Sequence, residues 1–212
     1  MALRDHSLDT KIVSAAFEEF LDKGYMGASL RKISEKAGAT VGAIRTRYKS
    51  KDDLFLSMLK PFLDEIEAAF QNIKSDYYSG TDSNILLQLK ASMKNESETI
   101  LHLIFTHYDE AVMLFYRSAG SSLEHYLDVL IENKIAESVT FFRSFGYTDI
   151  DEKLLGLLIS VQFNSYRQII INCHDRQTAE KYMNTLMIYH SAGWVSLFRS
   201  MDHIQEDKCN EI

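Results

Sequence analysis

The chain has 212 residues, a hydrophobic share of 46%, a net charge of −7 and two cysteines, Cys173 and Cys209. This length suits one large domain, or a small domain joined to a larger one, and the hydrophobic share supports a packed core, which excludes a disordered chain. The two cysteines are too few and too far apart for a disulfide framework or a zinc cluster, which fits a reducing cytosol.

The pattern of residues predicts an all-helical protein. There is one proline, Pro61, and nine glycines, and apolar residues recur at helical rather than strand spacing. No apolar run approaches the roughly 18 residues of a membrane span. The start, MALRDHSLDTK, lacks the apolar core of a signal peptide. We therefore expect a soluble, cytoplasmic protein with no membrane partner.

Residues 9–23 form the first predicted helix. Its start can be capped by Ser7 or Asp9, and Gly24 fits a left-handed position after its end. Six apolar residues fall on one stripe of this helix and predict its buried face: Ile12, Val13, Ala16, Phe17, Phe20 and Leu21.

Two short helices follow with a very short connection between them. Ser29 is a suitable N-cap for a helix over residues 30–37, which Gly38 ends. Thr40 then caps a third helix over residues 41–48. Two short helices joined by a short glycine-containing turn are typical of a helix-turn-helix.

The third helix has few features of a core element. Gly42 and Ala43 give its amino-terminal half a small surface that another molecule could approach closely, and Arg45, Thr46 and Arg47 are polar. Helix amino termini also attract phosphate. We therefore expect this helix to enter a DNA major groove.

The charge distribution agrees with that expectation. Residues 29–51 hold seven Lys and Arg and one acidic residue, Glu35, in a chain that is acidic overall. Such a basic cluster suits a polyanion, although charge alone favours an ordinary solvated surface over a binding surface.

Residues 12–55 resemble the DNA-binding region of the TetR/AcrR family of transcriptional regulators. The resemblance is carried by IVSAAFEEFLDKGY (12–25), SLRKISEKAG (29–38) and ATVGAIRTRYKSKDDLF (39–55), in this order and spacing. It implies a DNA-binding domain over residues 1–50, a helical ligand-binding and dimerisation domain over residues 51–212, and no enzymatic activity. It also implies a homodimer that binds operator DNA and is commonly a repressor released by a small molecule.

The resemblance assigns DNA-binding roles to individual residues of this chain. Its recognition helix falls on Val41–Tyr48, with groove-facing positions at Thr40, Gly42, Ala43 and Thr46. Arg45 stands where the family usually has an aromatic residue, and a guanidinium there can clamp phosphate or reach a guanine. Arg47 is either a second backbone contact or a surface residue. Phosphate-contacting positions fall on Ser29, Thr40, Arg45, Tyr48 and Lys51.

Helices are also predicted along the rest of the chain. One runs from Lys51 to about Lys74, with Ser50 and Asp53 as a capping box and Pro61 as either a hinge or a fixed bend. Further helices are expected over residues 84–106 and 122–145. Between them, another helix is expected to end at about Tyr116. Two long apolar helices close the chain, and they build either a monomeric core or, as the resemblance implies, the homodimer interface.

The middle helices mix aromatic and polar residues into apolar faces, as a small-molecule pocket requires. The candidate ligand-binding residues are His102, Phe105, His107, Tyr108, Phe115, Tyr116, Tyr126 and Tyr166, with Arg117, Asn164 and Arg167 nearby. No metal site or cofactor is expected, because His102 and His107 are five residues apart and do not share a helical face.

We interpret the chain as a ligand-responsive, DNA-binding transcriptional regulator. A helical small-molecule-binding protein whose helix-turn-helix no longer reads DNA is the second hypothesis. A helical enzyme is the third, although the chain contains no HExxH, Walker or Gly-x-Ser-x-Gly motif.

Overall fold

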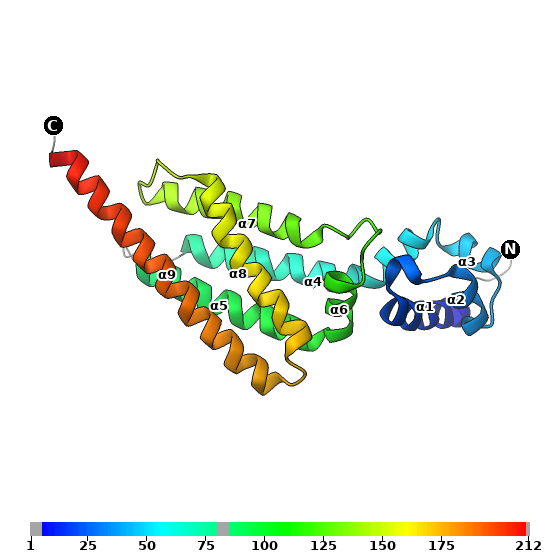
Figure 1. Cartoon of the computed structure of the whole chain (residues 1–212). Coiled ribbons are helices and arrows are strands. Elements are labelled where there is room, and N and C mark those ends of the chain that lie inside the picture. The colour runs from blue at the N-terminus through cyan, green and yellow to red at the C-terminus, as the bar shows by residue number, and fades with distance from the viewer. Residues whose placement is uncertain (1–5, 80–84, 211–212) are drawn as a thin grey trace. The chain divides into compact units, whose positions relative to one another are not determined.

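The computed structural model describes residues 6–79 and 85–210, and all regular structure within these ranges is α-helix (Figure 1). This confirms the prediction of an all-helical fold. The helices are α1 (His6–Gly27), α2 (Leu30–Ala37), α3 (Val41–Arg47), α4 (Lys51–Ser79), α5 (Ile85–Thr106), α6 (Tyr108–Tyr116), α7 (Tyr126–Ser144), α8 (Glu152–Asn172) and α9 (Arg176–Asn210).

The helices group into two compact units. The first unit comprises Met1–Ile66 and His107–Val129, and the second comprises Glu67–Thr106 and Leu130–Ile212. The first unit thus holds α1, α2, α3, the first half of α4 and α6, whereas the predicted division placed everything after residue 50 in the second domain. The chain passes between the units within α4, between α5 and α6, and within α7.

The core of the first unit forms where the amphipathic helices meet. Ile12 and Phe20 are fully buried, as their helical spacing predicted, and so are Ile33 and Phe55. The ring centroids of Phe20 and Phe55 lie 4.9 Å apart in an edge-to-face arrangement. This packing holds α1, α2 and α4 together. Helix α3 contributes chiefly Ile44 to the core, and Ile44 is 1% exposed.

Gly24 interrupts α1 near its end. Its φ of +69° is positive, as predicted, while its ψ of 168° lies outside the left-handed helical region. The backbone therefore leaves the helix at Gly24, and the amide of Tyr25 donates a 2.7 Å hydrogen bond to the carbonyl of Arg117, beyond α6. A residue with a Cβ atom at Gly24 would be strained by this φ.

The segment after α6 is held against the first unit's helices. The Ser122 amide donates a 2.9 Å hydrogen bond to the Asp52 carboxylate at the start of α4. A Cβ atom at Gly120, which has a φ of +82°, would come within 2.8 Å of the Met26 side chain. These contacts fix residues 117–122 beside the end of α1.

The predicted start of α7 was four residues too early. The Leu123 amide bonds the Ser121 hydroxyl, and the Gly120 amide bonds the Glu124 carboxylate, so this segment forms turns instead of a helix. The serine-rich sequence offered local side-chain partners that compete with helical hydrogen bonds. The helix begins only at Tyr126.

The second unit packs α5 and α8 against α9. Asp151 caps α8 by accepting hydrogen bonds from the amides of Lys153 and Leu154. One buried cluster joins three helices through Leu101, Tyr166, Ile169, Cys173, Ala179 and Met183. Among the residues described, α8 alone is long and apolar enough to cross a membrane, and the core helices of soluble proteins pass the same test.

Candidate nucleic-acid interface and internal cavity

The turn between α2 and α3 has the geometry that its sequence predicted. Gly38 ends α2 with φ 63° and ψ 34°, in the left-handed region that favours glycine. The Thr40 hydroxyl accepts a 3.0 Å hydrogen bond from the Ala43 amide and so caps α3. Gly38 and Thr40 fix the two ends of the turn, and Ile44 of α3 is buried in the core. Together these residues fix the direction of α3.

The side of α3 opposite Ile44 is open. Thr40, Gly42, Arg45 and Thr46 are exposed, and a Cβ atom at Gly42 would make an ordinary van der Waals contact with the Thr40 hydroxyl at 3.7 Å. No residue in the described part of the chain bonds or pairs with the Arg45 side chain, while the Thr46 hydroxyl donates to the Gly42 carbonyl. Val41 and Ala43 are half-buried beside them.

Two of the predicted DNA-binding cations have partners inside the protein. Arg47 forms an ion pair with Asp9 of α1 and donates a 3.1 Å hydrogen bond to the Ala43 carbonyl. Its guanidinium therefore ties α3 to α1, while its DNA contact stays a prediction.

Lys51 caps the end of α1. Its ammonium donates hydrogen bonds to the carbonyls of Tyr25, at 2.6 Å, and Ala28, at 3.2 Å. It also lies 4.2 Å from the centroid of the Tyr25 ring. These contacts offset the unfavourable position of a cation in the first turn of α4. Contact between Lys51 and DNA phosphate stays a prediction.

Ser29 and Tyr48 occupy cap positions at the ends of these helices. Ser29 is the half-buried N-cap residue of α2 but makes no side-chain cap hydrogen bond. Tyr48 is the half-buried C-cap residue of α3. The capping box predicted at α4 is present in altered form, because the Asp53 carboxylate accepts from the Lys49 amide rather than from that of Ser50.

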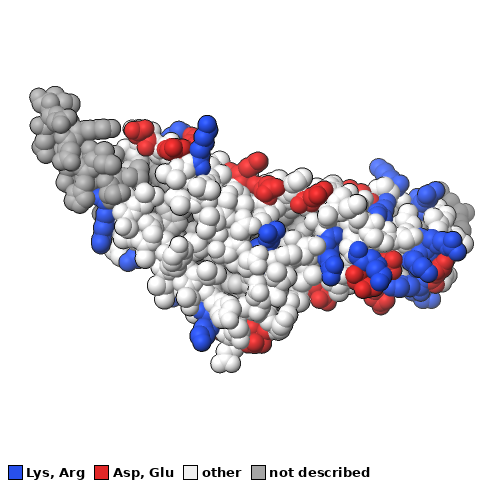
Figure 2. Space-filling view, viewed as in Figure 1, with Lys and Arg blue, Asp and Glu red and all other residues white. Residues whose placement is uncertain are grey.

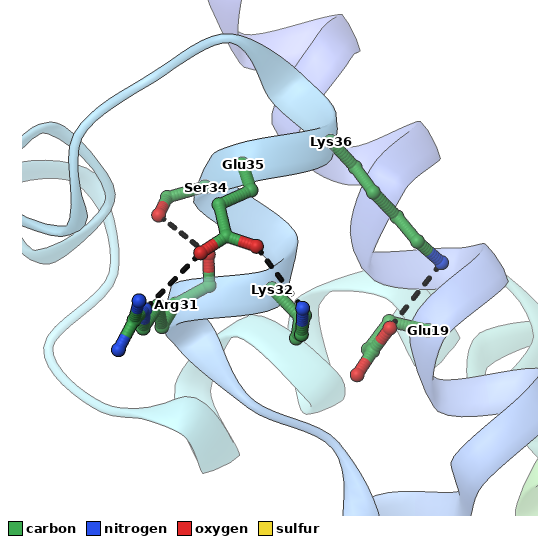
Figure 3. A network of polar contacts seen from close by, with 6 residues as sticks. All are labelled: Glu19, Arg31, Lys32, Ser34, Glu35 and Lys36. Atoms are coloured by element: carbon green, nitrogen blue, oxygen red, sulfur yellow. Dashed lines mark hydrogen bonds and ion pairs between the residues drawn. The ribbon is translucent and has the colours of Figure 1, made fainter.

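The outer face of α2 carries a polar network, drawn in Figure 3. Glu35 accepts a 3.1 Å hydrogen bond from Arg31 and one of 3.2 Å from Lys32, all on exposed side chains. The hydrogen bonds from Lys32 and Arg31 lower the pKa of Glu35 below its ordinary value. Lys36 instead points to α1, where it pairs at 3.2 Å with the buried carboxylate of Glu19.

The visible surface differs between the two units. In Figure 2, Lys and Arg side chains gather over the amino-terminal helices, with acidic residues among them. The visible face over α8 and α9 is mostly free of Lys, Arg, Asp and Glu. Positive charge is therefore concentrated near the helix-turn-helix, as the sequence predicted.

Helices α8 and α9 expose a set of large apolar side chains. On α8, Leu154, Leu157 and Val161 recur at helical spacing along one stripe, and Leu157 is 62% exposed. On α9, Tyr182, Ile188 and Tyr189 are also exposed. Exposed apolar groups in such a cluster are unusual for a surface that faces only water.

The eight predicted ligand-binding residues are divided between the two units. His107, Tyr108, Phe115, Tyr116 and Tyr126 lie in the first unit, whereas His102, Phe105 and Tyr166 lie in the second. Their role in ligand binding stays a prediction.

These residues also differ in their surroundings. His102 is exposed. His107 bonds the Glu65 carboxylate at 2.9 Å and lies beside the Phe62 ring. Phe105 packs on the buried cluster that contains Tyr166. The described structure therefore does not gather the eight residues into a single site within either unit.

A polar network that the sequence did not predict lies inside the second unit. Lys134 of α7 forms a buried ion pair with Glu96 of α5, whose other oxygen accepts a 3.3 Å hydrogen bond from the Gln162 amide. That amide also donates to the Tyr166 hydroxyl at 2.9 Å. The Trp194 indole N–H donates to the Gln162 carbonyl oxygen at 3.0 Å, which brings α9 into the network.

A small cavity adjoins this network. It has a volume of about 30 Å³, which suits about two water molecules. The polar residues that line it are Glu96, Lys134, Gln162, Trp194 and Ser138. The apolar lining residues are Leu89, Met93, Phe141, Phe142, Ile159 and Phe163.

One sequence signal could have found this network. Glu96 follows Leu89 and Met93 by seven and three residues, so it falls on the apolar stripe of its helix. Gln162 falls likewise between Ile159 and Tyr166. A charged or amide side chain within an apolar stripe is either buried with a partner or marks the end of the stripe.

His190 lies beside the network, with its ring centroid 6.2 Å from that of Tyr166. Burial lowers its pKa below the ordinary value, because desolvation disfavours the charged imidazolium. Its Nε2 atom has no hydrogen-bond partner among the described residues. The described residues also hold no group of three or more His, Cys, Asp or Glu side chains that could bind a metal ion.

Comparison with known proteins extends these observations. Residues 12–58 match the family of bacterial regulatory proteins known as the tetR family. The match covers α2, α3, most of α1 and the start of α4, which are the elements that build the helix-turn-helix.

Solved structures with the same fold match over most of the chain. A TetR-like transcriptional regulator from Rhodococcus sp. RHA1 has a TM-score of 0.60 and 15% identity, covering 90% of this chain and 99% of that one. NalD, the secondary repressor of the MexAB-OprM multidrug efflux pump in Pseudomonas aeruginosa, has a TM-score of 0.57 and 17% identity, covering 85% and 94%.

A third structure is the transcriptional regulator FadR from Bacillus subtilis in complex with stearoyl-CoA. It has a TM-score of 0.54 and 14% identity, and the match covers 84% of this chain and 97% of that one. At these identities the structures show a shared fold. Residues 12–58 therefore match the tetR family of bacterial regulatory proteins, and most of the chain has the fold of solved TetR-family transcriptional regulators.

Proposed function

We propose that the chain is a ligand-responsive, sequence-specific DNA-binding regulator that acts in the cytoplasm as a homodimeric repressor. A small molecule would release it from a near-palindromic operator. The observation that carries this proposal is the open face of α3, where Thr40, Gly42 and Thr46 lie exposed beside the unpartnered guanidinium of Arg45. The protein would act by binding and not by catalysis.

The geometry of α3 suits a major groove. Base edges are read by short polar groups and by arginine, and Gly42 allows the helix backbone to approach closely. Ile44 and the Arg47–Asp9 ion pair hold the other side of the helix, so α3 can bind as a rigid element. Arg31 and Lys32 add positive charge nearby for phosphate contact.

A homodimer is supported by the exposed apolar side chains of α8 and α9. The stripe of Leu154, Leu157 and Val161 needs a partner surface, and a second copy offers the same stripe across a two-fold axis. Two copies of α3 would then enter successive major grooves about 34 Å apart on a near-palindromic site.

A response to ligand is supported by the arrangement within each unit. The first unit joins α6 and the following turn to the end of α1 through Tyr25, Arg117, Asp52 and Ser122. The chain enters α6 directly from α5, and α5 carries Glu96 of the internal network. Movement of α5 on ligand entry would therefore reach the helix-turn-helix through α6. The structure of FadR bound to stearoyl-CoA is a precedent for a small molecule in this fold.

Selection of genomic DNA fragments by the purified protein tests this proposal. We expect a few fragments to be enriched that share a near-palindrome with half-sites about one helical turn apart. Arg45→Ala, selected in parallel, should lose this enrichment. Retention of DNA without a shared sequence, or no retention at all, would instead favour a small-molecule-binding protein that no longer reads DNA.

A further inference from the structure

We infer that the cavity beside Glu96 and Lys134 is the ligand site of the second unit, and that its ligand is an uncharged, mostly apolar molecule with one hydrogen-bonding group. This inference rests on the proposed function, in that it names the class of small molecule to which the protein responds.

The charges of the cavity wall are already balanced. Glu96 and Lys134 are the charged residues among those that line it, and they pair with each other at 0% and 8% exposure. A carboxylate or an ammonium entering this space would bring a charge with no counter-charge, and an unpaired charge in an apolar interior is strongly unfavourable. A neutral ligand adds no such charge.

The remaining wall selects an apolar body with a polar group at one side. Phe141, Phe142, Ile159 and Phe163 offer rings and branched aliphatic groups, against which an apolar ring or chain can pack. The Gln162 amide and the ion pair line the same cavity. A single carbonyl or hydroxyl on the ligand can hydrogen-bond to these groups and replace water there.

The cavity volume requires that the site opens when a ligand enters. A space of about 30 Å³ holds about two waters and is too small for a ring-containing molecule. Met93, a flexible lining side chain, is suited to yield first. Because the ligand fits only the opened form, it must shift the population of the two forms, which is the requirement for an allosteric response.

Three probes of similar size but different charge test the ligand class: cyclohexyl methyl ketone, cyclohexanecarboxylate and cyclohexylmethylammonium. Trp194 is the only tryptophan of the chain and lies at the cavity, so its fluorescence reports entry without any need for DNA. We expect the ketone to bind the full-length protein at least about tenfold more tightly than either ion. Ser138→Leu, which fills the cavity, should abolish binding.

Two charge variants make the test sharper. Glu96→Gln removes the carboxylate that pairs with Lys134, so the carboxylate should become the tightest of the three probes. Lys134→Met leaves Glu96 unpaired, so the ammonium should become the tightest. The double variant, Glu96→Gln with Lys134→Met, removes both charges and should again prefer the ketone, which keeps the test valid if a single variant fails to fold.

Several results would overturn the inference. These are preference of the wild-type protein for either ion, binding that survives Ser138→Leu, and failure of all three probes to bind. Such results would not contradict the proposed recognition of DNA by α3. Conversely, binding of the ketone with the expected ranking but no effect on DNA affinity would uphold the ligand site and contradict only the regulatory response.

Discussion

Arg45 and Lys51 are both basic residues of the helix-turn-helix region, but their side chains have different surroundings. Arg45 is exposed and has no partner among the described residues, while Lys51 donates to two backbone carbonyls at the end of α1. A free guanidinium can bind phosphate without breaking an internal contact. The two residues should therefore respond differently to mutation.

We expect Arg45→Ala to weaken binding to the selected DNA by about 10- to 100-fold and to reduce the salt-dependence slope by about one, since one charged contact is lost. Lys51→Met should instead lower the free energy of unfolding by about 1 to 3 kcal/mol, because two carbonyls lose a charged donor. Anisotropy titrations at several salt concentrations and urea denaturation measure the two effects.

Arg143→Ala provides a control for the DNA measurement, because Arg143 is an exposed arginine of the second unit. Its affinity and salt slope should equal those of the wild type. An unchanged slope for Arg45→Ala would remove this residue from the interface, and unchanged stability for Lys51→Met would show that the capping contacts contribute little.

At the scale of helices, the apolar stripe on α8 makes the clearest prediction. Val161 lies on the stripe at 50% exposure, whereas Val129 of α7 is 47% exposed and lies in the other unit. We expect Val161→Glu to convert the dimer to a monomer, because two-fold symmetry places a buried charge on both copies. Val129→Glu is the matched control.

Analytical ultracentrifugation of the two valine variants measures this difference. The control should sediment as a dimer at the same concentration as the wild type. If Val161→Glu sediments as a dimer too, the stripe on α8 is not the contact between copies.

The helix boundaries near the amino terminus were predictable because single residues specify them. Thr40 caps α3 by its hydroxyl, and Gly38 ends α2 in a conformation that few other residues adopt. The start of α7 was not predictable from spacing alone. There, serine and glutamate side chains bond neighbouring amides, and the contact between Gly120 and Met26 depends on a residue far away in sequence.

The internal network was missed for a different reason. Glu96 and Lys134 are 38 residues apart, and a sequence does not show that two charges on different helices meet in the interior. The predicted pocket instead rested on aromatic residues. One of these, Phe105, lies against the buried cluster of the second unit.

At the scale of the whole molecule, the chain passes between two units, each of which has its own core. The helix-turn-helix and α6 belong to one unit, and the internal cavity and the exposed apolar stripe belong to the other. Such a division allows DNA contact, ligand entry and dimer formation to be disturbed separately by mutation. Substitution of Arg45 tests DNA contact, substitution of Ser138 tests ligand entry, and substitution of Val161 tests dimer formation.

The most direct test of the account is a titration of the selected near-palindromic duplex, compared with the same duplex after one half-site has been scrambled. We predict two chains bound to each intact duplex and an affinity at least about 100-fold lower for the scrambled one, since only one copy of α3 then finds its bases. Equal affinity for both duplexes, or a single chain on the intact duplex, would contradict paired recognition by α3.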